Sequence, residues 1–226
     1  MKLKLLPLTA FVVAASPGLG TAATTLSYSK SVGLEIPDGD SNGLASQIAV
    51  SGTDLVTSVT LTLVTSSGWN GDLYAYLEHK GAITVLLNRA GLTADNSAGA
   101  ASTGMNVTFS DAATVDVHTG LSNTYGEQAT GTYQPDGRLA DPDEVLDSSP
   151  RTLSFAGFTG QVASGDWTLF IADVAGGETA TLDSWSLSLT TEPAGTSAVP
   201  EATTSLGLLA LGAGGLLTRR RSKRTA

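Results

Sequence analysis

The sequence predicts an all-β fold, a sandwich or barrel built as a single domain. Two observations favour this class. Short apolar runs recur through residues 24–191, separated by Gly, Asn and Asp, and no long stretch repeats apolar residues with the helical period of about 3.6. A chain of 226 residues is also long enough to bury one core without disulfides or metals.

The clearest strand signals lie in residues 165–189. Large apolar residues from Trp167 to Ile171 occupy alternate positions, which is typical of a half-buried strand. A second alternating run begins near Trp185, and the glycine-rich residues 175–178 between the runs favour a turn. We therefore predict an antiparallel hairpin whose two tryptophans are the largest contributors to the core.

Further strands are predicted upstream, because several short apolar or alternating runs are bounded by turn residues. They cover residues 26–32, 44–50, 56–65, 72–78, 83–87 and 105–109. In the longest run, Val59, Leu61 and Leu63 share one face. Between the strands we expect Trp69 in a loop and a long, irregular, acidic connection over residues 110–149.

The N-terminal residues 1–23 have the layout of a secretory signal peptide. Two lysines precede an apolar run over residues 5–15, which is too short to span a bilayer. Small residues near Ala22 and Ala23 then offer a cleavage site. We therefore expect export, with removal of this segment by signal peptidase.

The C-terminal residues 199–226 have three parts in a fixed order, after a linker over residues 193–198. A short motif comes first, then an apolar run, and then a basic cluster. The motif is Val199-Pro200-Glu201, and the cluster comprises Arg219, Arg220, Arg221, Lys223 and Arg224. A helix over residues 203–218 would extend about 24 Å against a bilayer core of about 30 Å, with the basic cluster on the cytoplasmic side.

This three-part order resembles the PEP-CTERM sorting signal, although Ala202 stands where that signal has its final proline. The resemblance implies that an exosortase cleaves near the motif. It also implies delivery to the cell envelope or the extracellular matrix, after transient membrane anchoring through the apolar helix. A plain C-terminal membrane anchor is the alternative.

Charge and composition exclude several classes of function. Residues 24–200 carry 5 basic and 20 acidic side chains, a net charge of −15, which argues against nucleic acid as a partner. The acidity suits either divalent cations or simple solubility. The chain has no cysteine, so it offers no disulfide and no thiol nucleophile, and 2 histidines are too few for a histidine-rich zinc site.

Several short motifs, taken in order, resemble the P domain (Homo B domain) of kexin- and furin-like proprotein convertases in its bacterial form. They include Ile36-Pro37-Asp38, Gly71-Asp72-Leu73, Tyr133-Gln134-Pro135, Gly165-Asp166-Trp167 and Leu182-Asp183-Ser184-Trp185. The resemblance implies a jelly-roll-like β-sandwich or barrel over residues 24–192. In convertases this domain packs against a subtilisin-like catalytic domain and stabilises it. Bacterial relatives also occur beside other hydrolases or alone on exported proteins.

Calcium is the cofactor expectation. The turn from Asp38 through Asp40 to Asn42 offers several oxygen ligands in one loop, but its spacing is not that of an EF-hand. P domains often carry calcium, so the resemblance adds Asp72 and Asp111 as candidate ligands. The alternative is that these acids only form turns.

Aromatic residues suggest a second kind of site. Trp69, next to Asn70, is the best candidate for a sugar-stacking surface, and packing in the core is the alternative. An exopolysaccharide is the corresponding partner.

Catalysis is not expected. The fragment from Gly195 to Pro200 resembles the nucleophile motif of subtilases, but its spacing is wrong by one residue and it lies in the linker. Among possible acid pairs, the sequence offers Asp72 and Glu78 as neighbours of Asp166 or Asp173, but it does not place them at a catalytic separation. We therefore expect an exported, non-enzymatic interaction or structural module. The alternatives are a calcium- or carbohydrate-dependent adhesion domain and an accessory domain that stabilises a separate secreted protease.

Overall fold

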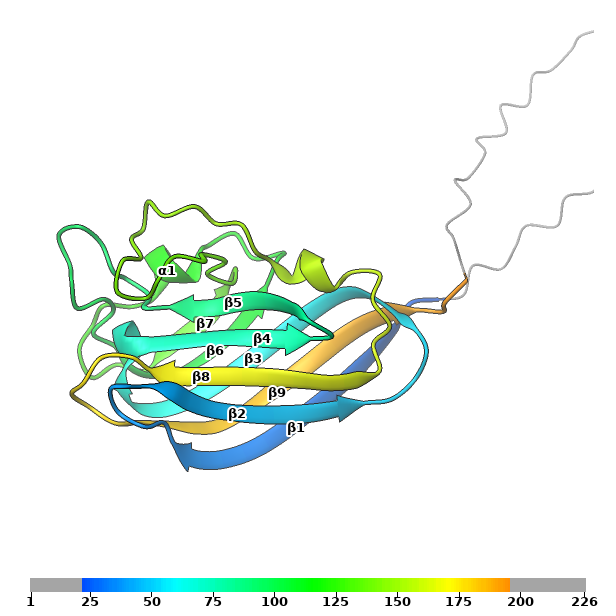
Figure 1. The fold of residues 1–226 in the computed structure, drawn as a ribbon, viewed down its shortest axis with the longest axis horizontal. Helices are drawn as coiled ribbons and strands as arrows, with labels where there is room; N and C mark the ends of the chain where they lie inside the picture. Colours follow the sequence, from blue (N-terminus) through cyan, green and yellow to red (C-terminus); the bar gives the residue numbers. More distant parts are fainter. Residues whose placement is uncertain (1–21, 196–226) are drawn as a thin grey trace, which may run out of the picture. The chain divides into compact units, whose positions relative to one another are not determined.

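Two β-sheets face each other in the computed structural model, which describes residues 22–195 (Figure 1). The expected signal peptide cleavage region before Ala22, the sorting motif, the apolar helix and the basic cluster lie outside the described residues. Within 22–195, no helix is long and apolar enough to cross a membrane. The predicted all-β sandwich is confirmed, and the described residues belong to a single compact unit.

The two sheets contain nine strands among the described residues. The five-stranded sheet has the order β1 (Thr24–Glu35), β9 (Ala180–Glu192), β3 (Leu55–Trp69), β6 (Thr103–Ser110) and β7 (Ala129–Tyr133). The four-stranded sheet has the order β2 (Asp40–Val50), β8 (Gly165–Asp173), β4 (Leu73–His79) and β5 (Ala82–Asn88). All pairings are antiparallel except that of β6 with β7. Three short helices join them, η1 (Asn70–Asp72), α1 (Val117–Gly120) and η2 (Phe155–Phe158).

The core lies between the sheets, and the alternation read from the sequence decides which side chains enter it. Trp167 and Trp185 are 0% and 1% exposed and are the two largest fully buried side chains, as predicted. Each indole N–H is satisfied, because Trp167 donates to the carbonyl of Ala163 and Trp185 donates to the Ser46 hydroxyl. Val59, Leu61 and Leu63 of β3 are also buried, so that face is confirmed.

The predicted hairpin is wrong. β8 pairs with β2 and β4, whereas β9 pairs with β1 and β3, so the two strands lie in different sheets and meet only through the core. The alternation and the glycine turn specify two neighbouring half-buried strands, but they do not specify whether the strands hydrogen-bond or face each other. Residues 174–179 carry the chain from one sheet to the other.

Two further expectations need correction. Trp69 ends β3 instead of lying in a loop, because β3 continues beyond a bend at Ser67 and Gly68. The connection 110–149 is not wholly irregular, since it contains α1 and β7. β7 is hard to find in the sequence because its residues, ATGTY, include a glycine and little apolar surface.

Candidate functional site

Among the described residues, one end of the sandwich gathers every predicted metal-binding or ligand-binding residue except Asp111. β2 and β8 are in register so that Asp40 opposes Asp173, and the backbone N–H of Gly177 donates to Asp38 Oδ1 at 2.9 Å. The N–H of Val174 donates to the carbonyl of Asp72 at 2.9 Å. We call this region, at the left of Figure 1, the acidic end. It comprises Asp38, Asp40, Trp69 to Asp72, and residues 173–178.

Three carboxyl groups of the acidic end influence one another, those of Asp38, Asp72 and Asp173. Burial raises the pKa of Asp72 to about 6; the nearby charge of Arg89 opposes this, and that of Asp38 adds to it. Burial likewise raises the pKa of Asp173 to about 7, against the opposing hydrogen bond from the Ala175 N–H and with the charges of Asp72 and Asp38 adding to it. Near neutral pH, the acidic end therefore holds at least part of a proton that an exposed carboxyl would release.

Asp173 is the most constrained of the three carboxylates. Its side chain is 0% exposed, Oδ1 accepts a hydrogen bond from the N–H of Ala175, and Oδ2 is buried with no hydrogen-bond partner. A buried carboxylate oxygen without a donor is costly, because the group has lost its hydration without a replacement. Binding of a proton or a cation would stabilise this oxygen.

Arg89 supplies positive charge to this cluster from one side. Its Nη2 lies 3.9 Å from Asp72 Oδ1, its Nη1 lies 3.8 Å from Asp143 Oδ1, and its Nε donates to the carbonyl of Gly71. The backbone of Arg89 has φ of 48°, an uncommon conformation for a residue with a side chain. The guanidinium thus lies closest to Asp72, and its charge opposes the rise in pKa of both Asp72 and Asp173.

The acidic end meets calcium's requirements in chemistry but not in spacing. Its donors are hard oxygens, which calcium prefers, and Asp173 Oδ2 is free to accept a ligand bond. However, within residues 22–195 no three acidic or histidine side chains lie close enough together to hold a metal ion. The exposed side chain of Asp38 would have to move inward for the three carboxylates to share one.

Asp111 lies far from the other calcium candidates. Its neighbour Ser110 pairs with Thr60, whereas Asp72 follows the end of β3 at Trp69, so the two acids are about 30 Å apart along the strand. The Asp111 carboxylate instead accepts hydrogen bonds from the N–H groups of Phe155 and Ala156 at the start of η2. That role is capping, which satisfies backbone donors.

Asn70 is buried and structural, although sequence reasoning grouped it with Trp69. Its amide nitrogen donates to the Ser102 hydroxyl at 2.9 Å and to the carbonyl of Gly104 at 2.8 Å. These bonds attach η1 to the loop before β6. Asn70 therefore holds the end of β3 in place and presents no amide to a ligand in this conformation.

Trp69 lines a hollow of about 240 Å³, which we call the aromatic hollow. Its lining residues are Ser67, Gly68, Trp69, Thr103, Tyr125, Gly126 and Glu178. The rings of Trp69 and Tyr125 have centroids 6.4 Å apart and planes at 79°, so they form two nearly perpendicular walls. Tyr125 is 71% exposed, which is unusual for a large aromatic side chain.

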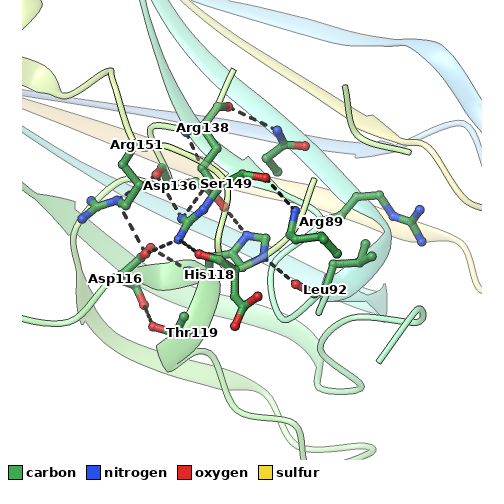
Figure 2. Close-up of polar contacts among 12 residues, drawn as sticks. Arg89, Leu92, Asp116, His118, Thr119, Asp136, Arg138, Ser149 and Arg151 are labelled. Atoms are coloured by element: carbon green, nitrogen blue, oxygen red, sulfur yellow. Dashed lines mark hydrogen bonds and ion pairs between the residues drawn. The ribbon is translucent and has the colours of Figure 1, made fainter. Parts of the chain in front are cut away.

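A second polar cluster is buried under the long loops, and Figure 2 shows it. His118 Nδ1 lies 2.8 Å from Asp136 Oδ2, and His118 Nε2 lies 2.9 Å from the carbonyl oxygen of Leu92. Arg138 donates to Asp136 and to Asp116, at 3.2 and 2.8 Å. We call these four residues, His118, Asp136, Arg138 and Asp116, the buried ion network.

The carbonyl oxygen of Leu92 can only accept, so Nε2 of His118 carries a proton, and the contact of Nδ1 with the carboxyl group of Asp136 favours the charged form of the ring. Burial alone would lower the pKa of His118. The hydrogen bond and charge of Asp136, with the carbonyl of Leu92, outweigh burial and the repulsion from Arg138, and they raise its pKa above the ordinary value. Through these contacts, His118 of α1 connects the segments that carry Leu92 and Asp136. Neither of its ring nitrogens is available as a base.

His79 is also fully engaged. It is 0% exposed, its two ring nitrogens each lie 3.0 Å from a carbonyl oxygen, of Asp166 and Val162, and its ring stacks on Trp167 with centroids 4.0 Å apart. Of the acid pairs considered from the sequence, Asp72 and Asp173 come together at the acidic end, where the charge of Asp72 helps to raise the pKa of Asp173. Glu78 and Asp166 lie toward the opposite ends of their strands from Asp72 and Asp173.

Sequence reasoning missed the partners that complete these sites. Tyr125 and Glu178 come from two segments that only the fold brings beside Trp69. The buried ion network likewise joins residues that are separated in sequence. An available signal was the density of Asp in residues 111–151 together with Arg138 and Arg151, because residues 24–200 contain only 5 basic side chains.

Comparison with known proteins relates part of this fold to a family. Residues 142–189 match the family model of the proprotein convertase P-domain. The matched residues include β8 and most of β9, which hold the two core tryptophans and Asp173. The P-domain resemblance is thus supported over the last third of the sandwich. No curated protein matches the chain.

Two solved structures are similar to the chain. One is a complex of a serine protease of Aeromonas sobria with a chaperone, at 16% identity and a TM-score of 0.45, covering 77% of this chain and 28% of that one. The other is a serine protease of Aeromonas sobria, at 14% identity and a TM-score of 0.44, covering 76% and 28%. This chain therefore spans less than a third of the length of either.

Proposed function

We propose that this chain is an exported, non-enzymatic β-sandwich of the P-domain type that acts by binding. The observation that carries the proposal is the state of the two histidines. Every ring nitrogen of His79 and His118 lies against a fixed oxygen acceptor, so neither histidine can activate a hydroxyl or a water molecule.

The partner that we propose is a separately encoded secreted hydrolase, which this chain stabilises as an accessory domain. The match of residues 142–189 to the P-domain model supports this choice. Export by signal peptidase and sorting by an exosortase to the envelope or exterior belong to the same proposal, and they rest on the two ends of the sequence.

Thermal inactivation of subtilisin-like proteases secreted by the same organism tests the accessory role. We expect the mature chain to lengthen the half-life of one such protease, with a dependence on concentration that saturates. The chain unfolded by heat before mixing is the control. Half-lives that stay unchanged for every protease tested would contradict the accessory role.

A calcium- or carbohydrate-dependent adhesion domain is the second candidate function. The observation that favours calcium is the buried Asp173 Oδ2, which has no hydrogen-bond partner. Calcium would be held by Asp173 with Asp72 and Asp38, after an inward movement of Asp38. A sugar stacked on Trp69 is the carbohydrate form of the same candidate.

Calcium binding has a direct test in the melting temperature. At pH 8 we expect millimolar calcium to raise the melting temperature of the wild-type chain, and Asp173→Asn to abolish that rise. Magnesium serves as the control, because it is smaller and gives up its water reluctantly. A wild-type melting temperature that does not respond to calcium would remove this candidate.

A further inference from the structure

The aromatic hollow has features of a small binding site that the accessory role does not require. Two aromatic rings stand at 79° to each other, and a carboxylate, that of Glu178, lines the same hollow of about 240 Å³. The volume is below the usual range of drug-sized pockets, so it suits a ligand group of a few non-hydrogen atoms.

The backbone fixes one wall of the hollow. Ser67 and Gly68 adopt φ of 56° and 58°, which bends β3 just before Trp69. A Cβ atom on Gly68 would lie 2.5 Å from the Cβ of Ala180, so the bend brings β3 into close contact with β9. The buried Nε1 of Trp69 has no hydrogen-bond partner, so this residue offers ring surface and not a hydrogen bond.

Charge limits what the hollow can bind. Glu178 is its only charged lining residue, and none of the lining residues is basic. The adjacent Gly177 N–H is bonded to the carboxylate of Asp38, which adds negative charge close by. An anionic ligand would be repelled, whereas a cation would be attracted by the carboxylates and by the negative faces of the aromatic rings.

We propose that the aromatic hollow binds a small organic cation, an alkylammonium group, between Trp69 and Tyr125 with Glu178 as its counter-ion. The shape of the hollow separates this ligand from a neutral sugar. The flat face of a sugar ring stacks on one aromatic ring at a time, whereas a rounded ammonium head presents the same surface to two perpendicular walls. A cation also needs the carboxylate, and a neutral ligand does not.

Calorimetric titration with choline chloride tests the proposal on the mature chain. EDTA is present throughout, so that calcium at the neighbouring carboxylates does not contribute. We expect saturable binding of choline. We expect binding about 10-fold weaker or undetectable for 3,3-dimethyl-1-butanol, which has the same shape without the charge. Glucose, at the same concentrations, reports on the sugar alternative.

Variants of two exposed residues locate the binding. Tyr125→Ala and Glu178→Gln should each weaken choline binding by about 5-fold to 10-fold, because each removes one attraction of about 1 kcal/mol. Glu127→Gln is the matched control, an exposed acid in the same loop as Tyr125 that does not line the hollow. All three side chains are exposed, so the melting temperature should stay unchanged.

Four results would overturn the proposal. The first is a wild-type chain that gives no saturable heat with choline. The second is equal binding of choline and its neutral isostere. The third is binding of glucose in place of choline, and the fourth is choline binding that Tyr125→Ala and Glu178→Gln leave unchanged.

Discussion

At the scale of single residues, two clusters contain buried charged groups, and these groups are compensated to different degrees. In the buried ion network His118 has two acceptors and Arg138 pairs with two carboxylates, although Nε of Arg138 has no hydrogen-bond partner. At the acidic end, Asp173 keeps an oxygen without a partner. Removing one partner from the first arrangement would leave a buried charge unpaired, whereas the second costs stability whenever Asp173 is ionised.

The cost at Asp173 predicts an unusual pH dependence. Because the folded pKa is about 7 and the unfolded value is about 4, the folded state holds the extra proton, and stability falls as pH rises through that window. Asp173→Asn cannot ionise. It should exceed the wild type at pH 8 by a free energy of unfolding on the order of 2 to 4 kcal/mol, and by much less at pH 4. Urea unfolding measures this difference.

Asp95→Asn is the control for Asp173, because Asp95 is an exposed carboxyl outside the cluster. It should change stability little at either pH. If Asp173→Asn proves less stable than the wild type at both values, the assigned cost of the buried carboxylate is wrong.

His118 predicts a pH dependence in the same direction as that of Asp173, because its pKa is also raised in the folded state. Its pKa is higher in the folded state, so its stabilisation is complete below the unfolded value of about 6.5 and is lost as pH rises through the folded value. His118→Gln should lower the free energy of unfolding by about 3 kcal/mol at pH 5.5, because it leaves Asp136 with one partner fewer. The loss should be smaller at pH 9. Equal losses at both pH values in denaturant titrations would contradict a charged His118.

At the scale of elements, the sequence predicts what depends on local pattern. Alternation located most of the strands, because each strand buries one face. It could not separate a hairpin from strands in facing sheets, so β8 and β9 were paired wrongly, and it missed β7, which has little apolar surface. The site shows the same limit. Asp38 and Asp72 lie in recognisable turns, but Asp173 and Tyr125 join them only through the arrangement of the sheets.

The aromatic hollow depends on the bend in β3 at Ser67 and Gly68. Substitution of Gly68 tests the geometry of that bend. Gly68→Ala should lower the free energy of unfolding by about 3 kcal/mol for two reasons. The added Cβ would lie too close to Ala180, and the φ of 58° is unfavourable for alanine. Gly33→Ala is the matched control, with φ of 65° and nothing within 4 Å, and it should cost only about 1 kcal/mol. If Gly68→Ala and Gly33→Ala lower the free energy of unfolding equally in thermal or urea unfolding, then contact with Ala180 of β9 is not the reason for glycine at position 68.

At the scale of the whole molecule, the described residues form a sandwich in which both histidines are engaged and three interacting carboxyl groups, those of Asp38, Asp72 and Asp173, lie at one end. The net charge of −15 over residues 24–200 favours a soluble surface and partners that are neutral or basic. We propose export and sorting from the two ends of the sequence. Our central claim is therefore that the chain is a binding module displayed outside the cytoplasm.

Intact-mass measurement of the native protein, from separated cell and medium fractions, tests that claim most directly. We predict a chain that begins near residue 23 and ends near the motif at residues 199–201, recovered from the envelope or the medium. A full-length chain of 226 residues, found in the cytosolic fraction alone, would contradict the account.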